Sequence, residues 1–300
     1  MQNQSQDFLG SGGVDLISDA TTEDREVITR PSPVETARAY GVTIEIGGMP
    51  IRLCTDDSMY LRKLQKRFAG FLGPSRPPQL ELDIDLVLPG RAGPEEQVQV
   101  RNDGGRWTIE RSDFQAGLDP ASRRGWVRQS AHPYATDSVL RILHSMFLAR
   151  EGGFLLHSAS AMRNGRSFFF FGPSGAGKST ILSVAPPDVT LLTDEISYLR
   201  KQGHQYVAHG TPFTGELGRA GENISAPVAA FYRLVQGTEN RIEPIPPAEA
   251  VRELLGCVLF FANDSELMKQ VFHAACELVS CVPVQRLVFQ PNARVWDLIV

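Results

Sequence analysis

The stretch that decides the fold reads Gly172-Pro173-Ser174-Gly175-Ala176-Gly177-Lys178-Ser179, and it follows the run Phe168–Phe171. It fits the phosphate-binding pattern G-x-x-x-x-G-K-[ST]. Four consecutive phenylalanines predict a strand buried on both faces, and the residues after Lys178 predict a helix. A strand, a glycine loop and a helix N-terminus place backbone N–H groups where they can hold an anion. The stretch therefore predicts a nucleoside triphosphate site rather than a chance glycine turn.

A β-hairpin leads into this loop. Residues 154–163 and 166–171 read as strands, and Asn164-Gly165 between them is a strong signal for a two-residue turn. Such a turn forces the register, which brings His157 opposite Gly172 at the edge of the loop. A histidine at a strand end can equally be a packed structural residue. The predicted pairs are Ser158 with Phe171, Ala161 with Phe168, and Arg163 with Arg166.

An acidic pair follows the next predicted strand. The helix after the loop is short because Pro186-Pro187 ends it, and residues 188–193 read as a buried strand that finishes at Asp194-Glu195. Adjacent strands of a parallel α/β unit end at the same edge of the sheet, so we expect both carboxylates beside the bound phosphates. There they could bind Mg²⁺ or accept the proton of an attacking hydroxyl. The alternative is an acidic pair that only faces water.

Further along, residues 211–223 are polar and punctuated by glycines, which is typical of an active-site or substrate loop. Transition-state charge on a phosphoryl group needs a cation besides Lys178, and Arg219 or Arg241 could supply it. Strands are expected at 196–199, 205–208, 231–235 and 284–289, and helices after Pro247, over 266–280 and around Trp296.

The first half of the chain shows no catalytic pattern. Residues 1–35 read as a mostly disordered leader, 36–135 as a small α+β domain, and 136–300 as the domain that carries the loop. Within the α+β domain, strict alternation over 80–86 marks a strand whose acidic row faces water. The other expected elements are hairpins over 42–54 and 98–110, and a helix capped by Asp56 or Asp57 whose buried face carries Met59, Tyr60, Leu64, Phe68 and Phe71.

Composition excludes several classes of protein. The formal net charge of −4 argues against a nucleic-acid partner. No apolar run is long enough to span a membrane, and the N-terminus lacks a secretory signal. Cys54, Cys257, Cys276 and Cys281 match no metal or redox spacing, so we expect free thiols in the cytoplasm.

With the loop, the histidine and the acidic pair together, the sequence resembles the HPr kinase/phosphorylase family and its HPr-kinase-like serine kinases, several of which tailor peptides. The resemblance covers about residues 140–300 and rests on the His157 strand, G-P-S-G-A-G-K-S-T, T-D-E, and the ending V-P-V-Q-R-L-V-F. It implies a fold like the nucleotide domain of phosphoenolpyruvate carboxykinase, with Asp194 as catalytic base and Glu195 assisting. It also implies a downstream acidic metal ligand, for which Glu216 has the right spacing. HPr kinases form rings, so a homo-oligomer is compatible with it. The glycine-rich signature of the bifunctional enzymes is absent, so neither HPr as substrate nor the reverse reaction is implied.

The leading hypothesis is transfer of phosphate from ATP, with Mg²⁺, to a serine hydroxyl of a peptide or small protein, such as a precursor peptide. Lys178 would neutralise phosphate charge, Ser179, Glu195 and Glu216 would bind Mg²⁺, and His157 would tune Asp194 or touch the γ-phosphate. The nucleotide would be cradled by Gly172, Pro173, Ser174, Gly175, Ala176, Gly177, Lys178, Ser179 and Thr180. The alternatives are a small-molecule kinase, or a regulator that binds nucleotide without transferring phosphate.

Overall fold

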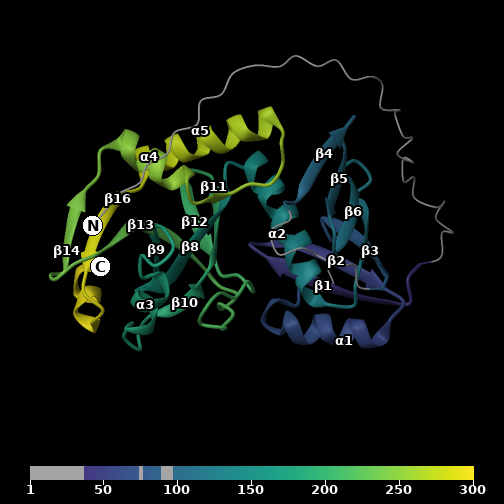
Figure 1. The fold of residues 1–300 in the computed structure, drawn as a ribbon, viewed down its shortest axis with the longest axis horizontal. Coiled ribbons are helices and arrows are strands. Elements are labelled where there is room, and N and C mark those ends of the chain that lie inside the picture. Colours follow the sequence, from purple (N-terminus) through teal and green to yellow (C-terminus); the bar gives the residue numbers. More distant parts are fainter. Residues whose placement is uncertain (1–36, 74–76, 89–96) are drawn as a thin grey trace, which may run out of the picture. The chain divides into compact units, whose positions relative to one another are not determined.

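The computed structural model describes residues 37–73, 77–88 and 97–300, so the expected leader over 1–35 lies outside the described residues. Residues 38–300 form one compact unit that contains two mixed β-sheets with helices (Figure 1). The expectation of an α/β fold is met at this level.

The first sheet has seven strands in the order β1-β2-β3-β7-β6-β5-β4. The alternation predicted for β3 is confirmed, because Leu80, Leu82 and Ile84 are buried while the acidic residues between them are partly exposed. Strands β6 and β7 were not predicted from the sequence. The bounds are β1 Tyr40–Ile46, β2 Met49–Thr55, β3 Leu80–Leu86, β4 Gln99–Asp103, β5 Arg106–Arg111, β6 Phe114–Asp119 and β7 Arg124–Gln129.

Helix α1 (Ser58–Arg67) packs on this sheet and begins at Asp57, whose side chain accepts from the N–H groups of Met59 and Tyr60. The predicted buried face is wrong at Met59, whose side chain is 60% exposed. Tyr60 and Leu64 are spaced four apart and define the buried stripe, whereas Met59 is rotated about 100° from Tyr60.

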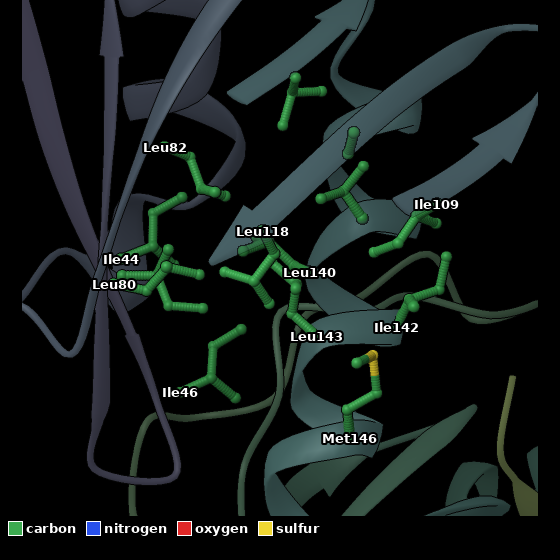
Figure 2. Close-up of a cluster of buried hydrophobic side chains, with 14 of the residues drawn as sticks. Ile44, Ile46, Leu80, Leu82, Ile109, Leu118, Leu140, Ile142, Leu143 and Met146 are labelled. Carbon is green, nitrogen blue, oxygen red and sulfur yellow. The ribbon is translucent and has the colours of Figure 1, made fainter. Parts of the chain in front are cut away.

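Helix α2 (Pro133–Arg150) is buried over most of its length. Its side chains Leu140, Leu143 and Met146 belong to the apolar core of the seven-stranded sheet (Figure 2). The same core cluster includes Leu155 and Tyr198 of the second sheet, so α2 is the central helix of the unit.

The second sheet contains nine strands. Its centre is the hairpin β8–β9, and the predicted register is confirmed: Ser158 pairs with Phe171, Ala161 with Phe168 and Arg163 with Arg166. The four phenylalanines are buried on both faces, as predicted, with Phe168 and Phe170 in one core cluster and Phe169 and Phe171 in another. The bounds are β8 Phe154–Arg163, β9 Arg166–Phe171, β10 Thr190–Thr193, β11 Ile196–Gln202, β12 Gln205–His209, β13 Ser225–Gln236, β14 Arg241–Pro244, β15 Val258–Leu259 and β16 Val284–Phe289.

The strand order differs from the simple parallel unit expected around the loop. Strand β10 pairs antiparallel with β8, which therefore separates it from β9. β10 and β11 run along the same edge of β8, and Asp194-Glu195 form the link between them. Because β9 and β10 are both antiparallel to β8, they still run in the same direction and end at the same edge. The acidic pair reaches the loop without being on the neighbouring strand.

Four helical segments complete the second sheet: α3 (Lys178–Ser183), α4 (Pro247–Leu255), α5 (Ser265–Cys281) and the 3-10 helix η2 (Ala293–Leu298). Helices α4 and α5 pack against each other and cover the core that contains Phe169 and Phe171. All four cysteines are free thiols. Within the described ranges, no helix is both long and apolar enough to cross a membrane.

Candidate functional site

The glycine loop Gly172–Ser179 joins the end of β9 to α3, which begins at Lys178. Gly177 caps this helix with φ of 105°, a conformation that L side chains rarely adopt. A Cβ on Gly177 would also lie 2.7 Å from Cζ of Phe289. Backbone conformation and close packing therefore both require glycine here.

A cavity of about 250 Å³ opens over this loop. We call it the loop cavity. It brings together the loop, the strand-end carboxylates and the expected downstream acidic residue, which come from three separate segments. Its lining includes Ser174, Gly175, Gly177, Lys178, Ser179 and Thr180 from the loop and α3, with His157, Asp194, Glu195, Gly215 and Glu216 opposite. Of the other expected loop residues, Ala176 is buried, and Gly172 and Pro173 line a second cavity.

Lys178 and Ser179 already make polar contacts around the loop cavity. The Nζ of Lys178 donates to the carbonyl oxygens of Gly172 at 3.2 Å and Pro173 at 3.5 Å. The Ser179 hydroxyl donates to Oε2 of Glu216 at 2.8 Å. The proposed metal ligands Ser179 and Glu216 are thus brought together, although they are far apart in sequence.

Asp194 holds the segment that carries Glu216. Its side chain is buried, Oδ1 accepts from the N–H of Gly215 at 2.9 Å, and Oδ2 accepts from the N–H of Leu217 at 2.9 Å. Farther along this loop, Gly221 packs so closely on β10 that a Cβ would lie 1.7 Å from the carbonyl oxygen of Leu192. Asp194 and Gly221 together fix the loop over 211–221 against the sheet.

Glu195 has a different environment from its neighbour. Its side chain is 33% exposed, and Nη2 of Arg141 lies 3.7 Å from its Oε2. Burial is the main cause that raises the pKa of Glu195 above its ordinary value of 4.5; the Arg141 cation opposes the rise and the Asp194 carboxylate adds to it. A carboxylate with a raised pKa is better suited to accept a proton near neutral pH.

Arg141 and its neighbours on α2 were missed from the sequence. The guanidinium of Arg141 lies 4.9 Å from the ring centroid of Phe213, its Nε is buried without a partner, and Asp137 is buried one turn earlier. Arg67 of α1 donates to Asp137 at 2.7 Å and to the carbonyl oxygen of Pro212 at 2.8 Å. The signal that could have revealed them is the presence of two charged residues inside an otherwise apolar helix.

His157 lies at the edge of the loop cavity, as the hairpin register predicts. Its backbone N–H donates to the carbonyl oxygen of Cys257 at 2.7 Å, and its side chain is the one exposed side chain among the first eight residues of β8. Desolvation by the surrounding protein, followed by the Lys178 cation, lowers the pKa of His157 below 6.5, so the ring is neutral at pH 7. No side-chain hydrogen bond links it to Asp194 among the contacts of the described residues.

The expected second cation is not found where the sequence suggested. Arg241 lies on β14, 2.8 Å from Glu243, and Arg219 is exposed; neither lines the loop cavity. Across ranges 37–73, 77–88 and 97–300, the one group of three clustered metal-ligand residues is Cys54, Glu81 and Asp83, in the first sheet. Within the part of the chain that the structure describes, the carboxylates of the loop cavity do not form such a group.

Comparison with known families gives one clear result. A family model described as "SynChlorMet cassette protein ScmC" matches residues 134–300, which is more than half of the chain and includes the whole loop cavity. This chain belongs to the ScmC family. A search of curated proteins found no match to this chain. Among solved structures, it is similar to the HPr(Ser) kinase/phosphatase from Coxiella burnetii, with 13% identity, a TM-score of 0.27, and coverage of 48% of this chain and 85% of that chain.

Proposed function

We propose that this ScmC family member transfers the γ-phosphate of ATP to a hydroxyl, most suitably a serine of a peptide or small protein. One observation carries the proposal: a single cavity is lined by the lysine and serine of a glycine loop and by three carboxylates, Asp194, Glu195 and Glu216. The loop and Lys178 suit a triphosphate. The carboxylates suit metal binding and proton transfer, and a proton acceptor is useful for phosphoryl transfer but not for nucleotide binding alone.

Lys178 would leave the carbonyl oxygens of Gly172 and Pro173 to contact the β- and γ-phosphates, because a phosphate oxygen is a stronger acceptor for an ammonium group. Ser179 and Glu216 fit a Mg²⁺ site completed by phosphate oxygens. When bound, the ion neutralises charge that develops on the transferred group.

The contacts favour Glu195 over Asp194 as the proton acceptor. Asp194 uses both carboxylate oxygens to hold the Glu216 segment, whereas Glu195 has a raised pKa and lines the same cavity. In the reaction, the acceptor oxygen bonds to the γ-phosphorus and the bond to the bridging oxygen breaks, leaving its electron pair on ADP. The hydroxyl proton passes to Glu195.

The test is transfer from labelled ATP with Mg²⁺ to a pool of serine peptides, for wild type and Glu195→Gln. Label in peptides that is lost in the variant supports the proposal. Label in a small-molecule fraction favours a small-molecule kinase instead. ATP binding with no labelled product in either fraction refutes phosphoryl transfer and leaves a nucleotide-binding regulator.

A further inference from the structure

A second and larger cavity, of about 500 Å³, is also lined by the glycine loop, at Gly172, Pro173 and Ser174. We call it the arginine pocket. It is formed where β13, α4 and β15 approach the end of β9. The residues that define it are His157, Gly172, Arg233, Arg252, Glu253 and Cys257.

The arginine pocket carries an excess of positive charge. Glu253 accepts from Nε of Arg233 at 2.8 Å and lies 3.8 Å from Arg252, so one carboxylate is shared by two guanidinium groups. Burial raises the pKa of the Cys257 thiol, and the pKa of His157 is lowered, so both are uncharged at pH 7. The side chain of Arg252 is 74% exposed and can turn toward a ligand. One positive charge is therefore left for an anionic group.

The pocket and the loop cavity adjoin each other. Arg233 pairs in register with Phe171, so it lies on the sheet face of Phe169 and Phe171, which α4 and α5 cover. His157 and Ser174 line both cavities, so the two cavities are adjacent at these residues.

The same junction is where a terminal phosphate would lie. The Nζ of Lys178 contacts the carbonyl oxygens of Gly172 and Pro173, which line the arginine pocket. The lysine of such a loop reaches the β- and γ-phosphates. Because His157 and Ser174 line both cavities, we expect the γ-phosphate that Lys178 contacts to lie close to the arginine pocket, while Ser179 and Thr180 line only the loop cavity.

We propose that the arginine pocket binds the phosphate acceptor, and that this acceptor carries a carboxylate close to its hydroxyl. This inference rests on the proposed function. Arg252 contacts the carboxylate, and the hydroxyl extends past His157 into the loop cavity, where it attacks the γ-phosphorus and gives its proton to Glu195. Two sources offer this chemistry: an acidic residue next to a serine in a peptide, and a free hydroxy amino acid.

The experiment compares three acceptors with the full chain, ATP and Mg²⁺: a serine hexapeptide with Asp beside the serine, the same peptide with Asn there, and free L-serine. We expect kcat/KM for the Asp peptide to exceed that for the Asn peptide about tenfold, the usual contribution of a charge-assisted contact. Arg252→Gln should reduce this ratio to about two or less through KM. Arg294→Gln, at an exposed arginine outside the pocket, is the matched control and should keep the ratio. If L-serine is the best acceptor and its KM rises in Arg252→Gln, the free amino acid is the source.

Equal use of the Asp and Asn peptides by the wild type, without an Arg252-dependent KM for L-serine, overturns the inference. The inference is also overturned if Arg252→Gln keeps the wild-type preference for the Asp peptide over the Asn peptide. If no acceptor is phosphorylated, the proposed function fails, and calorimetric binding of the three acceptors to the protein with Mg²⁺ and a non-hydrolysable ATP analogue decides the inference alone. If the wild type binds an acidic acceptor and Arg252→Gln does not, the inference that this pocket binds the acceptor is still supported. If the two proteins bind it equally, or neither binds it, the inference is refuted. Because Arg252 is largely exposed, the variant should fold, which its melting temperature checks.

Discussion

The two sheets each place acidic residues on a strand, with different outcomes. On β3, Glu81 and Asp83 face Arg124 on the neighbouring strand, at 3.0 and 3.9 Å, and Arg124 is 61% exposed. At the end of β10, Asp194 is buried and its partners are backbone N–H groups of a distant loop, while Glu195 faces a cavity that also holds Lys178. Carboxylates on or beside a strand thus become a candidate site through the groups of other segments that surround them, and not through their number or exposure, since the side chain of Glu195 is 33% exposed and that of Glu81 is 30% exposed.

The largest effect is expected at Lys178. Removing its charge with Lys178→Met should lower kcat/KM for phosphoryl transfer by about 10³-fold, since the cation acts on charge that develops in the transition state. The matched change in the first sheet, Arg124→Met, should leave kcat/KM within about twofold, because it removes an exposed ion pair. Steady-state kinetics with labelled ATP measure both. Equal losses of kcat/KM in the two variants would contradict the assignment of the active site to the second sheet.

The next effect separates the two members of the acidic pair. Glu195→Gln should lower kcat by about 10²-fold, the usual contribution of a general base, and leave nucleotide affinity nearly unchanged. The corresponding change Glu81→Gln on β3 is the control and should have no effect on kcat. A variant Glu195→Gln that retains full kcat would return the role of proton acceptor to Asp194.

Asp194 should affect both structure and rate. In Asp194→Asn one carboxylate oxygen becomes an NH₂ group that meets the N–H of Gly215 or Leu217, so the Glu216 segment loses an acceptor. A lost buried partner costs about 1–3 kcal/mol, so we expect a lower melting temperature and a fall in kcat of roughly 10- to 100-fold. The control Asp83→Asn should leave kcat and the Mg²⁺ requirement unchanged. Calorimetry and magnesium titration of the rate separate the effects, since a displaced Glu216 also raises the Mg²⁺ requirement.

The sequence was sufficient for features that depend on local signals. The Asn164-Gly165 turn predicted the β8–β9 register, and apolar alternation predicted β3, because both depend on residues close in the chain. The position of β8 between β9 and β10 could not be predicted, because pairing of distant strands leaves no local pattern. The partners of Arg67 and Arg141 could not be predicted for the same reason. Pro212 and Glu195 are brought near these arginines only by packing around α2.

Strands β6 and β7 illustrate another limit. β6 contains Gly117, which weakens a strand signal, yet a Cβ there would lie 2.4 Å from Nε1 of Trp126 on β7. The glycine is needed for a cross-strand contact that the sequence does not show. In the candidate site, the different surroundings of Asp194 and Glu195 could not be predicted, because the hydrogen bonds of Asp194 and the position of Glu195 beside Arg141 depend on distant segments.

His144 in the buried core should make the free energy of unfolding depend on pH. His144 of α2 is fully buried, its Nδ1 lies 3.2 Å from the hydroxyl of Tyr198, and burial lowers its pKa to about 3. Between pH 6.5 and about 3 the unfolded chain binds a proton that the folded chain does not, so stability falls as pH falls through this window. At pH 4.5 the loss from this residue should be about 3 kcal/mol. Urea unfolding of wild type and His144→Gln from pH 7.5 to 4.5 measures it, and a variant with the same pH slope as the wild type would contradict this assignment.

The smallest effect is expected in the acidic row of β3. A double-mutant cycle of Glu81→Gln and Arg124→Gln should give a coupling of about 0.5 kcal/mol or less, because an exposed ion pair gains little in water and loses side-chain entropy. Raising the salt concentration should reduce the coupling further, since charges near the surface are screened. The measurement is urea unfolding of the four proteins at two salt concentrations. A salt-insensitive coupling of about 2 kcal/mol would mean that these charges are effectively buried, and the contrast with Asp194 and Glu195 would then rest on their different partners alone.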